Sequence, residues 1–196
     1  RTFLAQRDAA GDWRRMTYRE ALDRVRKIAQ AILDRELSSE RPILILSGNS
    51  IEHALLALAA MFTGVLYAPI APAYSLQARD FSTLRHIFER VRPGLVFAAE
   101  GADYERPLMD VMPRDVELVV SASRPTSLPF TEFASLEGTA ATHAVDDAHA
   151  RVDGDTIAKV LSTSGSTGRP KGVINTQRML CSNQEMIRST LLFLAD

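Results

Sequence analysis

The chain has 196 residues, of which 46% are hydrophobic and 24% charged, an ordinary composition for a soluble globular protein. Its net charge of −1 argues against a nucleic-acid partner, and no polybasic run suggests an anionic membrane surface. Cys181 is the only cysteine, which excludes an internal disulfide, and no apolar run approaches the roughly 20 residues that cross a bilayer. No signal peptide is evident, so we expect a cytoplasmic protein.

Residues 12–16 have a short strand pattern, and a helix pattern follows. Thr17 and Glu20 form a capping box, in which each side chain satisfies a free backbone N–H at the start of a helix reaching about Glu36. The acid-first pairs Glu20–Arg24 and Asp23–Lys27 lie on its polar side. Its predicted apolar face consists of Leu22, Val25, Ala29, Ile32 and Leu33.

The next segment predicts a right-handed βαβ unit. Residues 43–46 are an apolar run typical of a strand buried on both faces. Residues 51–63 are apolar almost all round, which predicts a buried helix that Gly64 ends. Residues 65–70 then read as the second strand, so that strand, helix and strand fit within about 30 residues.

The alternation continues to residue 120. Residues 80–91 predict a helix and residues 95–98 a strand. Residues 104–112 form a weaker helix pattern that contains Pro107, and residues 116–120 form another strand. Residues 1–120 therefore predict an α/β region with a mostly parallel sheet flanked by helices.

The amino-acid composition changes from residue 121 to residue 155. This stretch is rich in Ser, Thr, Ala and Pro, with only short apolar pieces such as Phe130 and Phe133. We expect a polar surface connection there, only partly ordered. We interpret its acidic pairs, Asp146-Asp147 and Asp153/Asp155, as solvated charge and not as metal sites.

Residues 156–196 complete the same larger domain. A strand pattern at residues 157–161 and a shorter one at Val173 and Ile174 enclose a glycine-rich loop, which places that loop at the tip of a hairpin. A helix follows from about Thr176. An apolar stripe on this helix predicts core packing, and it consists of Met179, Leu180, Met186, Ile187, Thr190, Leu191 and Leu194.

The loop, Ser162-Thr-Ser-Gly-Ser-Thr-Gly-Arg-Pro-Lys-Gly172, carries the one sharp chemical signature. Gly165 and Gly168 can adopt positive φ without a Cβ clash, which would let successive backbone N–H groups turn inward as an anion-binding nest. Lys171 adds a compact positive charge, and Pro170 fixes the backbone before it. Hydroxyl donors suited to phosphate oxygens come from Thr163, Ser164, Ser166 and Thr167. The alternative is a flexible, solvated linker, but the loop is compact and lies between two strand patterns.

Two better-known nucleotide motifs do not fit this loop. The Walker motif requires Gly-x-x-x-x-Gly-Lys-Ser/Thr at the start of a helix. Counted from Gly165, its second glycine position holds Pro170, and Gly172 stands where a Mg²⁺-binding hydroxyl is needed. The dinucleotide fingerprint Gly-x-Gly-x-x-Gly is also absent.

The loop resembles the phosphate-loop motif of the adenylate-forming superfamily, which includes acyl-CoA synthetases, luciferases and peptide-synthetase adenylation domains. Thr163 to Gly172 match that motif without a gap, and residues 48–50, 59–64 and 67–74 resemble the family's first βαβ unit. The run from Asn175 to Asn183 resembles feruloyl-CoA synthetases. Many relatives have a histidine shortly after the loop, where this chain reads Asn175-Thr176.

The resemblance implies an enzyme that activates a carboxylic acid with Mg·ATP, giving acyl-AMP and pyrophosphate, and passes the acyl group to coenzyme A. ATP, Mg²⁺ and coenzyme A are thus the implied cofactors, and the partner is a small carboxylic acid, aromatic if the feruloyl likeness holds. The residues that would hold the phosphates are Thr163, Ser164, Gly165, Ser166, Thr167, Gly168 and Lys171.

The resemblance also implies what these residues lack. The chain begins at Arg1 and not at a methionine, and Asp196 directly follows a helical pattern, so we expect a piece of a longer protein. The adenine motif, the acyl pocket and the catalytic lysine of the family would lie beyond Asp196, which leaves no catalytic residue and no metal ligand in this stretch. Two alternatives stay open: another adenylating ligase, and a non-catalytic α/β module that binds an anion. The sequence does not predict an oligomeric state.

Overall fold

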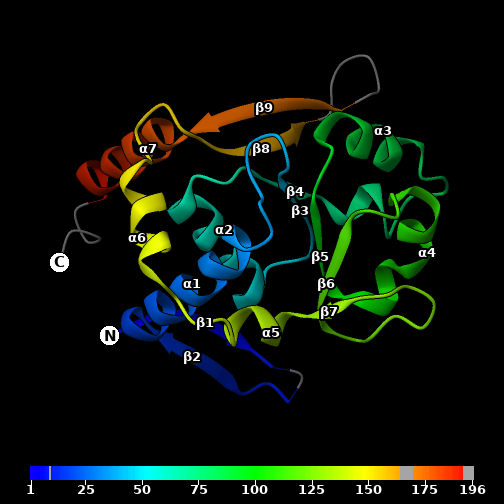
Figure 1. Cartoon of the computed structure of the whole chain (residues 1–196), viewed down its shortest axis with the longest axis horizontal. Coiled ribbons are helices and arrows are strands. Elements are labelled where there is room, and N and C mark those ends of the chain that lie inside the picture. The colour runs from blue at the N-terminus through cyan, green and yellow to red at the C-terminus, as the bar shows by residue number, and fades with distance from the viewer. Residues whose placement is uncertain (9, 164–169, 192–196) are drawn as a thin grey trace.

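The computed structural model describes residues 1–8, 10–163 and 170–191. Two sheets are present (Figure 1). The smaller one pairs β1 (Thr2–Arg7) with β2 (Trp13–Thr17) in antiparallel fashion. The larger one has seven strands in the order β7-β6-β5-β3-β4-β8-β9, and every neighbouring pair is parallel except β8 and β9. The predicted α/β class with a mostly parallel sheet is confirmed.

The elements of the large sheet follow one another in the predicted alternation. Its strands are β3 (Ile43–Leu46), β4 (Tyr67–Ile70), β5 (Leu95–Glu100), β6 (Glu117–Ala122), β7 (Thr131–Glu132), β8 (Ile157–Thr163) and β9 (Lys171–Thr176). The helices are α1 (Tyr18–Leu33), α2 (Ile51–Thr63), α3 (Ser82–Val91), α4 (Gly101–Val111), α5 (Phe133–Glu137), α6 (His143–Ala150) and α7 (Gln177–Thr190), and a 3₁₀ turn covers Pro72–Tyr74.

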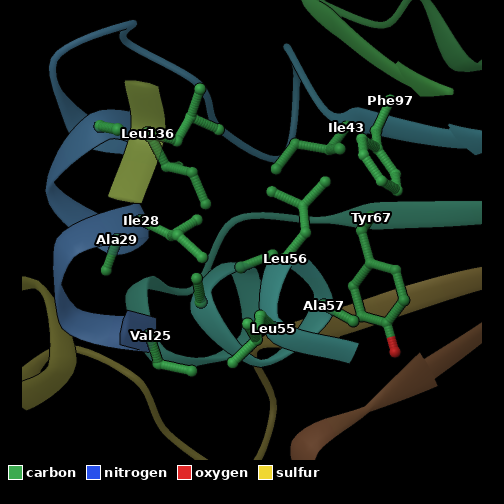
Figure 2. Close-up of a cluster of buried hydrophobic side chains, with 14 of the residues drawn as sticks. Val25, Ile28, Ala29, Ile43, Leu55, Leu56, Ala57, Tyr67, Phe97 and Leu136 are labelled. Carbon is green, nitrogen blue, oxygen red and sulfur yellow. The ribbon is translucent and has the colours of Figure 1, made fainter. Parts of the chain in front are cut away.

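The central strands β3, β5 and β6 of the large sheet are buried on both faces, as their apolar sequences predict. Along β3, Ile43 and Ile45 enter one core with α1, α2, α5 and α6, whereas Leu44 and Leu46 enter the other with α3 and α4. Figure 2 shows part of the first core, where Leu56 of α2 and Ile28 of α1 point toward the strands. All four residues of β3 are completely buried.

Local signals in the sequence set several helix ends. The Thr17 hydroxyl accepts from the Glu20 N–H, and the Glu20 carboxylate accepts from the Thr17 N–H at 2.7 Å, so the capping box is confirmed. This exchange lowers the pKa of Glu20, chiefly through the backbone N–H of Thr17. Gly64 ends α2 at a φ of 75°, a conformation that glycine adopts without strain.

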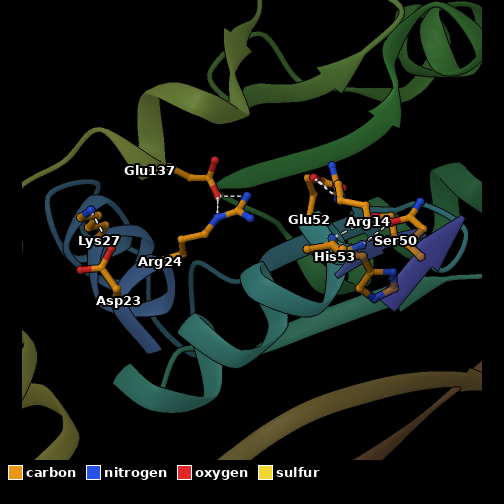
Figure 3. Close-up of polar contacts among 10 residues, drawn as sticks. Arg14, Asp23, Arg24, Lys27, Ser50, Glu52, His53 and Glu137 are labelled. Atoms are coloured by element: carbon orange, nitrogen blue, oxygen red, sulfur yellow. Dashed lines mark hydrogen bonds and ion pairs between the residues drawn. The ribbon is translucent and has the colours of Figure 1, made fainter. Parts of the chain in front are cut away.

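Helix α1 differs from its prediction in three details. It ends at Leu33, three residues before Glu36. Leu22 is exposed and not part of the buried face. The Asp23–Lys27 pair is present at 2.7 Å, but Arg24 pairs with Glu137 of α5 and not with Glu20, whose carboxylate is occupied by the cap (Figure 3).

The expectation of a partly ordered surface connection at residues 121–155 is wrong from residue 131 onward. Strand β7 adds to the sheet beside β6, and helices α5 and α6 pack on α1. Their few apolar residues are spaced three apart and reach the core from one side of each helix: Phe133, Leu136, Val145 and Ala148 are all buried. A polar composition concealed these contacts because only two residues of each short helix face inward.

Polar contacts join this segment to α1 as well. The amide oxygen of Gln30, a buried polar residue, accepts from both the N–H and the hydroxyl of Thr142 at the start of α6. Arg26 forms a two-point contact with Asp146. In the described part of the chain, no helix is long and apolar enough to span a bilayer.

Candidate functional site

Strands β8 and β9 form the hairpin that carries the predicted phosphate loop. Thr163 and Lys171 are directly opposite each other in its ladder, and the Thr163 hydroxyl donates to the Lys171 carbonyl oxygen at 3.4 Å. The structure thus brings together two residues of the predicted phosphate site, Thr163 and Lys171, at the two ends of the loop. The other five predicted residues, Ser164, Gly165, Ser166, Thr167 and Gly168, lie outside the described residues, as does Arg169.

The charge at the end of this hairpin is positive. Lys171 is exposed and forms no ion pair within the part of the chain that the structure describes. A compact ammonium without a carboxylate neighbour attracts an anion more strongly than a paired one, because no internal contact has to be broken first. The Thr163 hydroxyl beside it adds a neutral donor or acceptor. These two groups fit an anionic ligand such as phosphate.

The hairpin is joined to the parallel sheet at one ladder position, Tyr67 of β4 against Lys159 of β8. Tyr67 is buried, and burial raises the pKa of its phenol. The remaining pairs of β8 are all with β9, so the loop end of the hairpin extends away from the rest of the sheet.

The base of the hairpin is fixed by polar contacts that sequence reasoning missed. Asp153 accepts from the N–H groups of Asp155 and Thr156 and from the Thr156 hydroxyl. These bonds, led by the one from the Thr156 hydroxyl, lower the pKa of Asp153. The spacing Asp-x-x-Thr was the available signal, since Asp and Thr side chains commonly bond the backbone of such turns. Both Asp153 and Asp155 are exposed, as solvated charges are, and the turn contacts are an additional role.

A second group of contacts ties the base to α2 and α7. The Gln177 side chain donates to the Met61 carbonyl oxygen at 3.1 Å, near the end of α2. Arg178 pairs with Asp155 at 3.0 Å. A Cβ on Gly154 would lie 2.9 Å from the Arg178 guanidinium, so the glycine leaves room for that side chain. The hairpin is therefore held at its base and open at its loop end.

Gly172 matters to the hairpin through packing. A Cβ at this position would lie 2.9 Å from Cγ1 of Val160, on the neighbouring strand. We expect Gly172→Ala to lower the free energy of unfolding by about 1–3 kcal/mol, because the β-branched Val160 has few alternative rotamers. Chemical denaturation measures the change. Gly48→Ala is the control, since its Cβ would meet nothing within 4 Å. Equal stability of the two variants would contradict this packing role.

The apolar stripe of α7 does not pack into a core, contrary to expectation. Its helix contributes no buried residue, and the side chains of Met179 and Met186 are exposed. The period of the stripe correctly predicted a helix. Leu180 and Ile187 of the stripe are half-buried, and Leu194 lies outside the described residues. Val173, Ile174 and Leu191 are also exposed, so exposed apolar side chains are frequent between residues 173 and 191.

The comparison with protein families gives the class. Residues 1–194 match the family described as AMP-binding enzyme, and the chain belongs to that family. The predicted membership of the adenylate-forming superfamily is therefore confirmed. The match includes both halves of the chain, the α/β region as well as the hairpin and α7.

Curated relatives from two enzyme types resemble the chain. It is 31% identical over 187 residues to "4-coumarate–CoA ligase-like 9" of Arabidopsis thaliana, covering 93% of this chain and 30% of the relative. It is 29% identical over 182 residues to the probable non-canonical nonribosomal peptide synthetase CymA of Salinispora arenicola, covering 93% of this chain and 2% of that protein. The chain thus spans less than a third of the length of these relatives.

Solved structures share the fold. The Brucella canis acyl-CoA synthetase matches with a TM-score of 0.74 at 19% identity, over 96% of this chain and 33% of that one. MatB from Rhodopseudomonas palustris with ATP bound matches with a TM-score of 0.68 at 23% identity, over 92% of this chain and 33% of that one. At these identities the likeness establishes the fold of this region alone.

Proposed function

We propose that this chain is the phosphate-binding part of an AMP-forming acid–thiol ligase, which activates a carboxylic acid with ATP as an acyl-adenylate and transfers the acyl group to coenzyme A. One observation supports it best: in a member of the AMP-binding family, a hairpin places Lys171 opposite Thr163 at the two ends of a Gly-, Ser- and Thr-rich loop. Lys171 is exposed and has no ion-pair partner among the described residues. Lys171 and residues 163–168 hold the β- and γ-phosphates.

The residues of this chain act by position and charge. ATP supplies the adenylyl group and, as Mg·ATP, brings its own metal ion. Lys171 offsets negative charge on the phosphates, and the backbone N–H groups that Gly165 and Gly168 allow to converge would donate to phosphate oxygens. Such fixed charges and donors supply most of the rate in phosphoryl-type reactions.

The proposal also specifies the acceptor of the acyl group and the acid that is activated. The similarity to a 4-coumarate–CoA ligase-like protein supports coenzyme A as acceptor and an aromatic acid of the feruloyl type as substrate. The similarity to a peptide synthetase favours the second candidate, an adenylation domain that passes its acyl group to a carrier. A non-catalytic anion-binding module is the third.

The chain by itself is expected to bind ATP weakly and to lack ligase activity. Four charge-assisted hydrogen bonds contribute about 6–12 kcal/mol, at about 1.5–3 kcal/mol each. Association costs about 4–15 kcal/mol, so the two nearly cancel. Carboxylate-dependent ATP–pyrophosphate exchange is the measurement: we expect none from residues 1–196 and exchange with ferulate from the longer protein. Exchange by residues 1–196 alone would contradict this. A longer protein that adenylates amino acids and not ferulate would favour the second candidate.

A further inference from the structure

A pocket of about 610 Å³ lies between the hairpin and the second half of α3. In Figure 1 α3 lies beside the loop end of the β8–β9 hairpin, and residues of both elements line the pocket. Its volume falls within the range of sites for small organic ligands, and it is much larger than a single phosphate group needs. The site described above uses one residue of this pocket, Lys171.

One wall of the pocket is apolar. Four hairpin residues line it at alternating positions, Val160 and Ser162 on β8 and Gly172 and Ile174 on β9. The ladder places Val160 opposite Ile174 and Ser162 opposite Gly172, so all four lie on one face of the hairpin. Four further apolar residues line the pocket: Pro42, Leu66, Ile87 and Val91.

The charged groups of the pocket are all basic. Arg90 of α3 and Lys171 of β9 line it, together with His86. Neither Arg90 nor Lys171 has an ion-pair partner within the described ranges, and none of the described residues that line the pocket is acidic. Lys171 follows the alternation of Val173 and so lies on the other face of the hairpin, which leaves Arg90 as the cation beside the apolar wall. This arrangement matches a ligand with an anionic head and an apolar body.

Three other hollows lack this combination. The one between the start of α3 and α4 has arginines, but Asp80 and Asp110 line it too. The one beside α7 combines Arg178 with Asp153. The one between β1 and the start of α2 is lined by no Lys, Arg, Asp or Glu side chain among the residues described. Unopposed positive charge therefore distinguishes the pocket beside α3.

We propose that this pocket binds a carboxylic acid with an apolar body, whose carboxylate is held by Arg90 and whose body packs on Val160 and Ile174. Nothing in the phosphate role of the loop requires this site, and Arg90 and Ile174 lie outside the predicted phosphate motif. It is also separate from the acyl pocket, which the family resemblance places beyond Asp196.

The test uses 3-phenylpropanoate, 3-phenylpropanol and inorganic phosphate as probes, with binding to the 196-residue chain followed by NMR titration. We expect the acid to bind more tightly than the alcohol or phosphate, with shifts at α3 and the hairpin. Arg90→Gln should weaken acid binding about tenfold and leave alcohol binding unchanged. Arg85→Gln is the charge-matched control, because Arg85 pairs with Asp110 and does not line the pocket.

The apolar wall is tested separately. Ile174→Ser should weaken both the acid and the alcohol, whereas Val173→Ser, at the neighbouring exposed position, should affect neither. The proposal is overturned if the acid does not bind, if phosphate binds as tightly as the acid, or if Arg90→Gln and Arg85→Gln behave alike. ATP titrations of the same variants of the longer protein distinguish the acid site from the phosphate site. Arg90→Gln is expected to lose acid binding and to retain ATP affinity.

Discussion

Lys171→Ala in the longer enzyme is expected to lower the rate of carboxylate-dependent adenylation by about 100- to 1,000-fold, the usual effect of removing one preorganised charge or donor from a site where negative charge develops. The ammonium is exposed at the end of β9, opposite Thr163, and has no carboxylate neighbour in the described ranges that would share its charge. Its removal leaves the phosphates without that charge and leaves the protein core unchanged. Steady-state kinetics of pyrophosphate exchange measure the effect.

Two further variants separate charge from folding. Lys171→Arg keeps the charge but replaces a compact ammonium with a planar guanidinium, so partial activity is expected. Lys159→Ala removes a half-buried lysine from the other end of the same hairpin, opposite Asn175, and should leave the rate within about threefold of the parent, since screened charges far from a site act weakly. Unchanged nucleotide affinity and unchanged rate in Lys171→Ala would refute the phosphate role.

Phe97→Ala is expected to cost about 3–5 kcal/mol of unfolding free energy, as for other fully buried aromatic residues. Phe97 lies in β5, in the interior of the sheet, and is completely buried. Its ring, labelled in Figure 2, packs at 5.3 Å, centroid to centroid, from the ring of Phe133 at the start of α5. Because domains of this size are stable by only about 5–15 kcal/mol, such a loss is a large fraction of the total.

Urea denaturation of the 196-residue chain measures this loss. Phe3→Ala makes the same chemical change on β1 of the small sheet, where the ring is 36% exposed and contacts Tyr18. Its cost should stay below about 1 kcal/mol. A similar loss for both variants would show that the interior of the sheet does not dominate stability.

Periodicity predicted most of the fold because most elements bury a regular pattern. The run at residues 43–46 and the apolar helix at residues 51–63 can be buried only inside a covered parallel sheet, and the βαβ unit followed. The same reasoning failed at α5 and α6. There the helices are short and polar, and their place against α1 depends on long-range contacts such as Arg24 with Glu137, which no local pattern contains.

The site was predictable in part for a similar reason. The composition of the loop indicates phosphate chemistry directly, and its two ends, Thr163 and Lys171, do meet in the hairpin. The contacts that fix the base of the hairpin could not be predicted from local sequence. Gln177 contacts Met61, which is more than a hundred residues away in the chain, and Arg90 lines a pocket with hairpin residues only because α3 packs beside the hairpin.

A structure of the longer protein with bound ATP tests the central claim most directly. We predict that the β- and γ-phosphates lie on the loop at the end of the β8–β9 hairpin, within hydrogen-bonding distance of the Lys171 ammonium. A triphosphate bound at another part of the surface, with Lys171 facing solvent, would contradict the proposed function.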